Sequence, residues 1–486
     1  MKDKRKKNEA LKYHSHPKPG KIEVVPTKKY SSQRDLSLAY SPGVAEPCLA
    51  IADNKDDVYK YTSKGNLVAV ISNGTAVLGL GNIGPEASKP VMEGKGLLFK
   101  IFADIDVFDI EVDTEDIDTF IETVKNIAPT FGGINLEDIK APEAFEIERR
   151  LVEELDIPVM HDDQHGTAII CTAALKNAIE ITGKKLNKVK IVVNGAGAAA
   201  ISCTRLYISL GVKKENILMC DSKGVIQKSR KDLTSQKAEF ATDQTDKLTL
   251  EDAMVDSDVF VGLSKGNIVT PAMLLTMAKD PIVFAMANPE PEIDYKLAIE
   301  TRDDIIMATG RSDFPNQVNN VLGFPFIFRG ALDVRATKIN EAMKMAAVHA
   351  LADLAKESVP EQVNITYDEV NIKFGKEYII PKPFDQRLIS TIPPAVAKAA
   401  MDSGVAQKPI TNWENYKHEL EDRLGTGNKI VRLLHNRAKS NPKRVVFAEG
   451  DHLDVLKAAQ YVHEEGIAIP ILLGDKETIL ELMEEI

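Results

Sequence analysis

Short apolar runs alternate with longer segments of helical spacing through the middle of the chain. The expected strands are Val189–Asn194, Asn216–Cys220, Asp258–Leu263, Ile282–Ala287 and Asp304–Thr309. Segments such as Ala199–Leu210 and Pro271–Ala278 lie between them and have the spacing of amphipathic helices. Strands that alternate with helices need crossover connections, so the pattern predicts an α/β fold with a Rossmann-type, doubly wound parallel sheet.

The region before this sheet is less regular and predicts a separate α/β domain. Its apolar runs are Leu67–Ile71, Val107–Val112 and Ile157–Met160, and its helical stretches are Asp116–Ile127 and Pro142–Leu155. After residue 381 the pattern predicts a helix at 393–401, a polar connector, a strand at 445–447 and a helix at 453–464. The expected division is a basic tail at 1–17, a substrate and metal domain at 18–165, a dinucleotide domain at 166–400, a linker at 401–428 and a partial, truncated α/β segment at 429–486.

Charge and composition narrow the classes of function. The formal net charge of -11 argues against a protein built to hold nucleic acid or an anionic membrane. The basic stretch Lys4–Lys7 is followed by no apolar run, so we expect a solvated, poorly ordered tail and no signal peptide. No segment approaches the roughly 20 apolar residues that span a bilayer. The four widely spaced cysteines favour reduced, buried residues of a soluble, cytoplasmic protein.

A glycine-rich loop follows the first strand of the expected Rossmann sheet and opens a helix. It consists of Gly195, Ala196, Gly197, Ala198, Ala199 and Ala200. The first glycine permits a tight turn, the second lets the backbone approach a pyrophosphate, and the small Ala200 lets the helix pack close to the sheet. The helix N-terminus supplies free N–H groups and a positive dipole end. This loop predicts a dinucleotide site.

A second glycine motif, Gly79–Gly84, competes with the first by spacing alone. The segment after it carries Pro85 and Pro90 and predicts a poor crossover helix. A tight structural turn is an equally good interpretation of this copy, so the motif at Gly195 is the better cofactor site.

The choice between NAD and NADP depends on the end of the next strand. Asp221 stands where an acid that binds the ribose is expected, and a carboxylate there repels a 2′-phosphate. Ser222 and Lys223 follow at once, and Lys237 lies downstream, so the sequence favours NADP and leaves NAD open.

Acidic residues gather at two further strand ends. Glu137 and Asp138 follow one expected strand, and Asp162 and Asp163 follow another within the run His161–Thr167. Several hard oxygen ligands without a nearby cysteine suit Mg²⁺ or Mn²⁺ better than zinc, although any one of these acids could simply cap a helix. His161 and His165 straddle an expected loop, which argues against a zinc pair.

Two further residues carry chemistry that spacing does not settle. Lys95 stands between two glycines in an apolar stretch, where burial could lower its pKa towards that of a general base. A surface lysine is the ordinary interpretation. Tyr40, within Ser37–Val44, is no more informative by itself.

Over roughly residues 15 to 425, these motifs together closely resemble the bacterial malic enzymes. The motifs that carry the resemblance are Ser37–Val44, Lys89–Lys95, Leu136–Asp138, His161–Thr167, Ala287–Pro289 and Val318–Pro325, in the family's order. The resemblance implies oxidative decarboxylation of malate to pyruvate and CO₂ with reduction of NADP, and at least a homodimer. It also assigns the Gly79 motif to the substrate domain.

The resemblance also implies roles for individual residues. Lys95 would take the malate hydroxyl proton, assisted by Asp162, and Tyr40 would protonate C3 of the decarboxylated product. The implied ligands of Mg²⁺ or Mn²⁺ are Glu137, Asp138 and Asp163. The implied substrate residues beside the nicotinamide are Asn288 and Asn320, with Asn319 as a third candidate. The implied cofactor residues are Gly195, Ala196, Gly197, Ala198, Ala199, Asp221, Ser222, Lys223 and Asn288.

Two features of the chain differ from the pattern of many malic enzymes. Many relatives have an arginine shortly before the Gly79 motif, whereas this chain has Thr75, Ala76 and Val77, so the cation for the distal carboxylate stays open, with Arg311 as a guess. The runs at 441–450 and 471–475 resemble the opening of a phosphate acetyltransferase domain, which the large hybrid malic enzymes carry and which implies an acetyl-CoA effector.

Two other functions remain to be weighed. A plain NAD-linked dehydrogenase would need no metal and would rely on a histidine–aspartate pair. An acyl-CoA-responsive regulatory module is supported only by the final segment.

Overall fold

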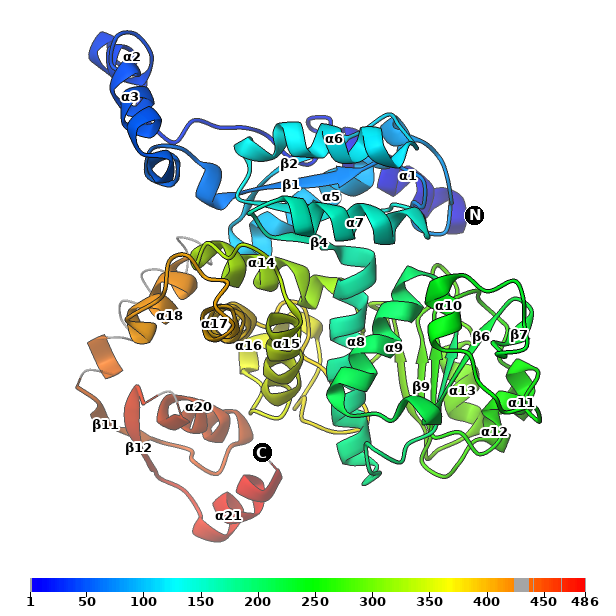
Figure 1. Ribbon diagram of the computed structural model, residues 1–486. Helices are drawn as coiled ribbons and strands as arrows, with labels where there is room; N and C mark the ends of the chain where they lie inside the picture. Colours follow the sequence, from blue (N-terminus) through cyan, green and yellow to red (C-terminus); the bar gives the residue numbers. More distant parts are fainter. Residues whose placement is uncertain (1, 424–436, 440, 465, 486) are drawn as a thin grey trace.

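The computed structural model describes residues 2–423, 437–439, 441–464 and 466–485 (Figure 1). Its first domain is built on a parallel sheet in the order β2-β1-β3-β4. The strands are β1 Leu67–Ser72, β2 Asp106–Glu111, β3 Gly133–Leu136 and β4 Val159–His161. Successive side chains of β1 enter two different cores: Val68 and Val70 join the core that contains helix α5, while Ala69 and Ile71 join the core under α6 and α7. The expected separate α/β domain is confirmed.

Helix α5, Pro85–Ala103, corrects the expectation of a poor crossover helix after the Gly79 motif. Pro85 stands in the first turn, where its missing N–H costs no hydrogen bond. Pro90 stands inside the helix, where a proline costs about 3 kcal/mol. Burial of Met92 and Phe99, at about 1.5–3 kcal/mol each, offsets that cost. Tertiary packing therefore decides the structure of this segment.

The second domain is built on a sheet in the order β10-β9-β8-β5-β6-β7, parallel except for the short edge strand β7. Its strands are β5 Ile191–Asn194, β6 Ile217–Asp221, β7 Gly224–Val225, β8 Val259–Gly262, β9 Ile282–Ala285 and β10 Ile306–Thr309. Strand β5 lies between β6 and β8, so the chain order reverses at its carboxyl end, where doubly wound sheets bind ligands. The predicted Rossmann-type sheet is confirmed.

Helices cover both faces of this sheet. The helices of its core side are α8 Asp162–Ile181, α9 Ala198–Leu210, α14 Phe324–Asp333, α15 Glu341–Leu354 and α17 Arg387–Asp402. The outer helices are α11 Leu250–Met254, α12 Pro271–Thr276 and α13 Tyr295–Thr301. The short helix α10 Ser235–Glu239 lies on the core side, where Glu239 pairs with Arg205 of α9. Helix α8 begins directly after β4 and runs down from the first domain between α15 and α9 of the second (Figure 1), so the boundary expected at 165 lies inside it.

The N-terminal segment departs from the compact body. The expected irregular tail is the helix α1 Lys2–Ser15, whose described side chains are mostly exposed. Helices α2 Gln33–Ala39 and α3 Ala45–Asp53 project from the first domain (Figure 1), and we call residues 33–53 the arm. The short helices η1 Lys55–Asp57, α4 Val58–Tyr61 and η2 Lys64–Asn66 lead from the arm to β1.

The C-terminal part begins with a segment that was expected to be a linker. Helix α18 Trp413–Asp422 packs on α17, and the Tyr416 hydroxyl donates to Asp333 Oδ2 at 2.7 Å, so the described part of 401–428 is packed. Residues 424–428 of the expected linker and 429–436 of the expected last domain lie outside the described residues. The last described elements are β11 Lys443–Phe447, α20 Leu453–Glu464, β12 Ala468–Leu472 and α21 Lys476–Glu485, with the two strands parallel.

The remaining short helices connect these elements. They are η3 Ala128–Thr130, η4 Lys214–Asn216, η5 Asn320–Leu322 and α16 Glu361–Tyr367, and the helices over the first sheet's second face are α6 Ile117–Ile127 and α7 Glu143–Glu154. Within the described residues, none of the helices combines the length and apolarity that crossing a bilayer requires.

Candidate active site

Four carboxylates meet at the carboxyl ends of β3 and β4. Strands β3 and β4 are paired in parallel with Leu136 opposite His161, so Glu137 and Asp138 lie beside Asp162 and Asp163. One oxygen from each of Glu137, Asp138 and Asp163 lies within 4.8 Å of the others. We call these four residues the acid pocket. Glu137, Asp138 and Asp162 are buried, and only Asp163 is partly exposed.

Helix α5 places Lys95 against this acid pocket. Its Nζ lies 2.5 Å from Asp162 Oδ2 and 3.1 Å from Glu137 Oε1, and 4.5 Å from the centre of the Phe324 ring. Burial alone would lower the pKa of Lys95, but the carboxylates of Asp162 and Glu137 outweigh it and hold that pKa above its usual value. The expectation of a lowered pKa is therefore wrong for these residues by themselves, because four acids surround one ammonium group.

The acid pocket fits a divalent cation. When all four carboxylates are ionised, Lys95 leaves a net charge of -3. Burial and mutual repulsion raise the pKa of Glu137 and raise that of Asp138 to about 7. Asp138 Oδ2 is buried and has no hydrogen-bond partner. Three hard oxygen ligands that repel one another and lack full hydrogen bonding match the ligand set of Mg²⁺ or Mn²⁺.

Hydrogen bonds hold these acids in place. Asn135 Nδ2 donates to Glu137 Oε2 at 3.0 Å, and the Asp138 N–H donates to Asp163 Oδ2 at 2.8 Å. Asn320 Nδ2 donates to Asp162 Oδ2 at 2.5 Å. Gly166 stands one turn along α8, where an added Cβ would collide with Asp162 Oδ1. The first turn of α8 thus closes tightly over the acid pocket.

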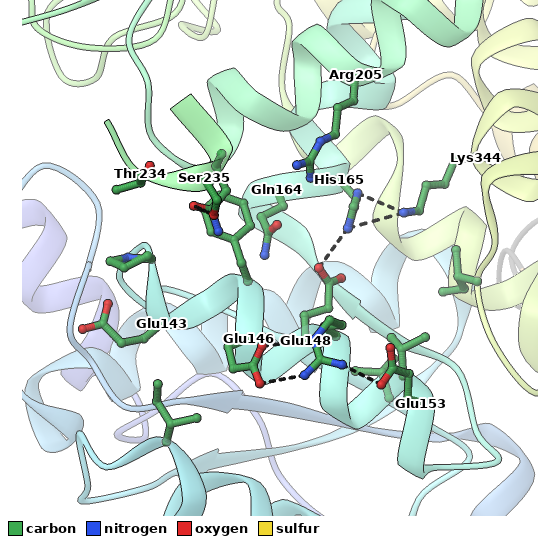
Figure 2. Close-up of a pocket in the computed structure, with 18 residues that line it drawn as sticks. Glu143, Glu146, Glu148, Glu153, Gln164, His165, Arg205, Thr234, Ser235 and Lys344 are labelled. Carbon is green, nitrogen blue, oxygen red and sulfur yellow. Dashed lines mark hydrogen bonds and ion pairs between the residues drawn. The ribbon is translucent and has the colours of Figure 1, made fainter. Parts of the chain in front are cut away.

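His165 takes part in a structural network, as Figure 2 shows, and no loop separates it from His161. Lys344 Nζ lies 3.0 Å from His165 Nδ1, and His165 Nε2 lies 3.0 Å from Glu148 Oε2. Burial would raise the pKa of Glu148, but His165 and Lys344 lower it to about 2. Glu148 also accepts from the His161 N–H at 2.8 Å. The network ties α7, α8 and α15 together beside a cavity of about 870 Å³.

The glycine loop at Gly195 has the geometry of a dinucleotide site. Gly195 has a φ of 129° and lies against the backbone of Leu263, so a side chain would strain and block the turn. Gly197 caps α9 and faces open space. Ala196, Ala198 and Ala199 are partly exposed, while Ala200 is buried. A pyrophosphate can therefore approach the helix N-terminus.

Asp221 is enclosed by cations rather than open to a ligand. Arg230 Nη1 and Nη2 lie 2.9 and 2.8 Å from its two oxygens, and Lys237 Nζ lies 2.9 Å from Oδ2. Burial would raise the pKa of Asp221, but these partners hold it well below its usual range. Ser222 and Lys223 follow in the turn, and Lys223 Nζ binds Asp232 at 2.6 Å.

The asparagine candidates are placed differently from one another. Asn320 reaches the acid pocket through Asp162, as described. Asn319 uses its side-chain oxygen to accept from the Val321 N–H at 3.0 Å, within its own turn. Asn288 is exposed after β9, and its backbone oxygen lies against Gly79 of the first domain. Arg311 is paired with Asp313 at 2.8 and 2.6 Å.

Tyr40 is not brought to the acid pocket of its own chain. It ends helix α2 in the arm, and 77% of its surface is exposed. Other apolar side chains of the arm are exposed with it, namely Leu36, Leu38, Val44 and Leu49. Cys48 is also exposed there, which corrects the expectation that every cysteine is buried, whereas Cys171, Cys203 and Cys220 are buried. All four are free.

Sequence reasoning missed three residues that support these sites. Asn135 alternates with buried apolar residues in β3, where a polar side chain signals a specific partner. Phe324 belongs to the motif Val318–Pro325, but nothing in the sequence predicted that its ring lies against Lys95. Arg230 lies nine residues beyond Asp221 in a run of mixed charges, and only the folded turn shows which carboxylate it meets.

Comparisons with known proteins agree with this architecture. The family model described as "Malic enzyme, N-terminal domain" matches residues 19–152, and "Malic enzyme, NAD binding domain" matches 164–372. "Phosphate acetyl/butaryl transferase" matches 429–485. The chain is 56% identical to an NADP-dependent malic enzyme of Salmonella typhimurium over 99% of its own length and 63% of the relative's. The chain thus spans under two thirds of the length of such relatives.

A shorter relative and a solved structure are covered almost completely. The NADP-dependent malic enzyme of Halomonas elongata is 61% identical over 83% of this chain and 96% of the relative. The crystal structure of malic enzyme from Pyrococcus horikoshii superimposes with a TM-score of 0.78 at 40% identity, over 89% of this chain and 98% of that one. With both domains matched in order, this chain belongs to the malic enzyme family.

Proposed function

We propose that this chain oxidises and decarboxylates (S)-malate to pyruvate and CO₂, with reduction of NADP⁺ and with a divalent metal ion. The observation that carries the proposal is Lys95 held between Asp162 and Glu137 in an acid pocket that the dinucleotide domain also reaches, through Asn320. A plain dehydrogenase would have no use for three converging metal-type carboxylates. The relatives from Salmonella typhimurium and Halomonas elongata are NADP-dependent malic enzymes, which supports the same reaction.

Each group in the site has a proposed task. Lys95 takes the proton of the substrate hydroxyl, and Asp162 positions Lys95 and helps to pass that proton on. Mg²⁺ or Mn²⁺, held by Glu137, Asp138 and Asp163, would supply a Lewis acid for the hydroxyl and carboxylate oxygens of malate. NADP⁺ in the Gly195 loop would accept the hydride. Because a bound cation offsets the carboxylates around Lys95, it would also lower the pKa of that lysine towards the range a base needs.

Asparagine side chains are proposed to orient the substrate. Asn320 donates into the acid pocket, and Asn288 stands at the carboxyl end of β9, where a nicotinamide would lie. Asn319 is a weaker candidate because its side-chain oxygen already caps a turn. Arg311 would need to release Asp313 before it could bind the distal carboxylate.

Tyr40 acts, in this proposal, in the acid pocket of a second copy of the chain. Its hydroxyl would protonate C3 of the three-carbon enol that remains after CO₂ leaves. The arm that carries it exposes a group of apolar side chains, which a monomer would leave in water and which a partner subunit would cover. The protein is therefore a homodimer or a higher homo-oligomer.

The segment that matches the phosphate acetyltransferase model is proposed to serve regulation. Its described elements are the parallel strands β11 and β12 and the helices α20 and α21. In the large hybrid proteins we expect it to respond to acetyl-CoA. The free cysteines fit a cytoplasmic location, since reducing compartments keep thiols unpaired.

The test is a coupled assay on the 486-residue chain. L-malate is supplied with NADP⁺ or NAD⁺, with Mn²⁺ or with EDTA, while reduced cofactor and pyruvate are both measured. Pyruvate formation that needs Mn²⁺ and prefers NADP⁺ is the expected result. Oxaloacetate without pyruvate in EDTA would replace the proposal with a plain dehydrogenase, and no turnover under any condition would leave the regulatory function.

Mixing two inactive variants tests the placement of Tyr40. Tyr40→Phe and Lys95→Ala chains each lose activity alone. After co-expression, mixed dimers hold one site with both native residues, so activity should return to roughly a quarter of the wild-type value, one intact site in each mixed dimer at random pairing. No recovery, in mixtures shown to exchange subunits, would place Tyr40 in the site of its own chain.

A further inference from the structure

A cavity of about 530 Å³ lies at the joint between the two malic enzyme domains, apart from the one beside His165. One wall is formed by residues 56–66, which lead from the arm to β1, and another by the end of α14 and the loop that follows it. Lys408 and Arg423, beyond α17, complete the lining. The volume falls in the range of small-molecule sites, about 300–1,000 Å³. We call it the joint cavity.

Cations outnumber acids in the walls of the joint cavity. The acids are Asp56 and Asp333, and Asp104 stands behind Arg423 at 3.3 Å from its Nη1. The cations are Lys60, Arg329, Arg335, Lys408 and Arg423. Five cations against these three acids leave a surplus of +2. A phosphate monoester carries about -1.5 to -2 at pH 7, so one phosphoryl group would neutralise the surplus.

Arg329 is already engaged by the fold. Its Nε and Nη2 donate to the two oxygens of Asp333 at 2.9 and 2.5 Å, and its Nη1 donates to Asn66 Oδ1 at 2.5 Å. The hydrogen bond to Asn66 crosses from the second domain to the first. Arg329 therefore fixes the wall of the joint cavity and leaves ligand binding to the other cations.

Arg335 and Lys408, in contrast, keep donors that no described protein group uses. Arg335 Nη2 donates to Asp56 Oδ1 at 3.0 Å and to Gln407 Oε1 at 3.3 Å, but its Nε is buried without a hydrogen-bond partner among the described residues. The side chain of Lys408 has no hydrogen bond or ion pair within the same part of the chain. A buried charged donor without an acceptor is costly, and a ligand oxygen would remove that cost.

The backbone holds these two cations side by side. The Lys408 N–H donates to the Val334 carbonyl at 2.9 Å, and the Gln407 N–H donates to the Arg335 carbonyl at 3.3 Å. The guanidinium carbon of Arg335 lies 4.2 Å from the centre of the Tyr59 ring, which restricts its rotation. The pair is thus arranged before a ligand arrives, which lowers the entropy cost of binding.

We propose that the joint cavity binds the phosphoryl group of a small molecule, and that Arg335 and Lys408 hold it. Charge-assisted hydrogen bonds from a guanidinium and an ammonium to phosphate are stronger than neutral ones. Lys60 and Arg423 line the same cavity and add attraction. Because the walls come from both domains, a bound phosphate would brace the joint that Arg329 and Asn66 already bridge. No step of the proposed reaction uses this cavity.

Calorimetric titration of the 486-residue chain with inorganic phosphate, in metal-free buffer at constant ionic strength, tests the site. Arg335→Gln and Lys408→Gln should each weaken phosphate binding about 10- to 100-fold, the range of one to two charge-assisted hydrogen bonds. Asp56→Asn should tighten it about two- to fivefold, because an acid that competes for Arg335 is removed. The matched control is Lys279→Gln, an 89% exposed lysine of the dinucleotide domain, which should change nothing.

Lys408→Gln keeps the test independent of folding, because its side chain has no described partner to lose. Two further probes identify the ligand class. Tighter binding of ribose 5-phosphate than of inorganic phosphate would point to an organic phosphate, and the reverse to free phosphate, and both support the site. Phosphate binding that is absent from the wild-type chain, or unchanged in Lys408→Gln, would overturn the inference. Succinate that binds as tightly, with the same dependence on Lys408, would overturn it too.

Discussion

The acid pocket and the surroundings of Asp221 are built from the same residue types but carry surplus charge of opposite sign. We call the second group, Asp221, Lys223, Arg230, Asp232 and Lys237, the Asp221 cluster. In the first, four carboxylates surround Lys95, and the pKa of Asp138 rises to about 7. In the second, three cations surround two carboxylates, and the pKa of Asp221 falls well below its usual range. Both sites follow the carboxyl end of a parallel strand. The sign of the surplus charge, set by which side chains the turns bring in, decides whether a cation or an anion is bound.

Removal of Lys95 gives the largest expected effect, because among the described residues it is the lysine that pairs with two carboxylates of the acid pocket. Lys95→Ala should lower turnover about 10²–10⁴-fold, or ~3–5 kcal/mol of barrier, with the Kd for NADP⁺ little changed. Lys89→Ala is the control, a half-exposed lysine of the same helix that binds Asp109. Steady-state kinetics with both cofactors measure the loss. Turnover near that of the control would remove Lys95 from the mechanism.

Metal binding should relieve the repulsion that distinguishes the acid pocket. At a free Mn²⁺ concentration 100 times its Kd, we expect about 2.7 kcal/mol of stabilisation, seen as a higher melting temperature than in EDTA. In EDTA, Asp138→Asn should melt above the wild type, since one buried repelling charge is gone. If Mn²⁺ left the melting temperature unmoved, the acid pocket would lose its assignment as a metal site.

One hydrogen bond from Asn135 orients Glu137 in the acid pocket, and removing it tests how far metal binding depends on that orientation. Asn135→Ala should weaken Mn²⁺ binding about 10- to 100-fold, as expected when a residue that orients a metal ligand is lost. Calorimetric titration with Mn²⁺ measures it. Asn82→Ala, which removes an exposed amide bonded to Glu115, should leave the affinity unchanged. Equal affinities for both variants would contradict an orienting role.

Lys223→Gln gives the smallest effect. This lysine is 65% exposed and pairs with Asp232, so solvent screens its charge. We expect 2′,5′-ADP binding to weaken only about two- to threefold, and the difference from the wild type to fade at high salt. A loss of about tenfold or more would mean that solvent does not screen Lys223 in this way and that the lysine itself contacts the phosphate.

Local patterns predicted most of the fold but only part of the site. Strands β5, β6, β8, β9 and β10 coincide with apolar runs in the sequence. The two-residue edge strand β7 has no such run. Helix α5 was underestimated because its burial, which local propensity does not record, offsets Pro90. The pKa of Lys95 was expected in the wrong direction because Glu137 and Asp162 approach it from distant parts of the chain.

The exposure of Tyr40 shows a different limit. The family resemblance gave the residue a role, but no pattern in one chain tells whether an arm returns to its own body or reaches another. The partners of Asp221 show a third limit, since Arg230 lies in a loop and Lys237 in the short helix α10, and the sequence leaves the path between them open.

Helix α8 links the acid pocket to the glycine loop at Gly195. Its first turn carries Asp162 and Asp163, and its length packs along α9, whose first turn is the dinucleotide loop. A shift of α8 would therefore move Asp162 and Asp163 and would press on α9, the helix that follows the glycine loop. By thermodynamic linkage, if metal makes the cofactor bind tighter by some factor, the cofactor must tighten the metal by the same factor. The total free energy of binding metal and cofactor would then be the same whichever of the two binds first.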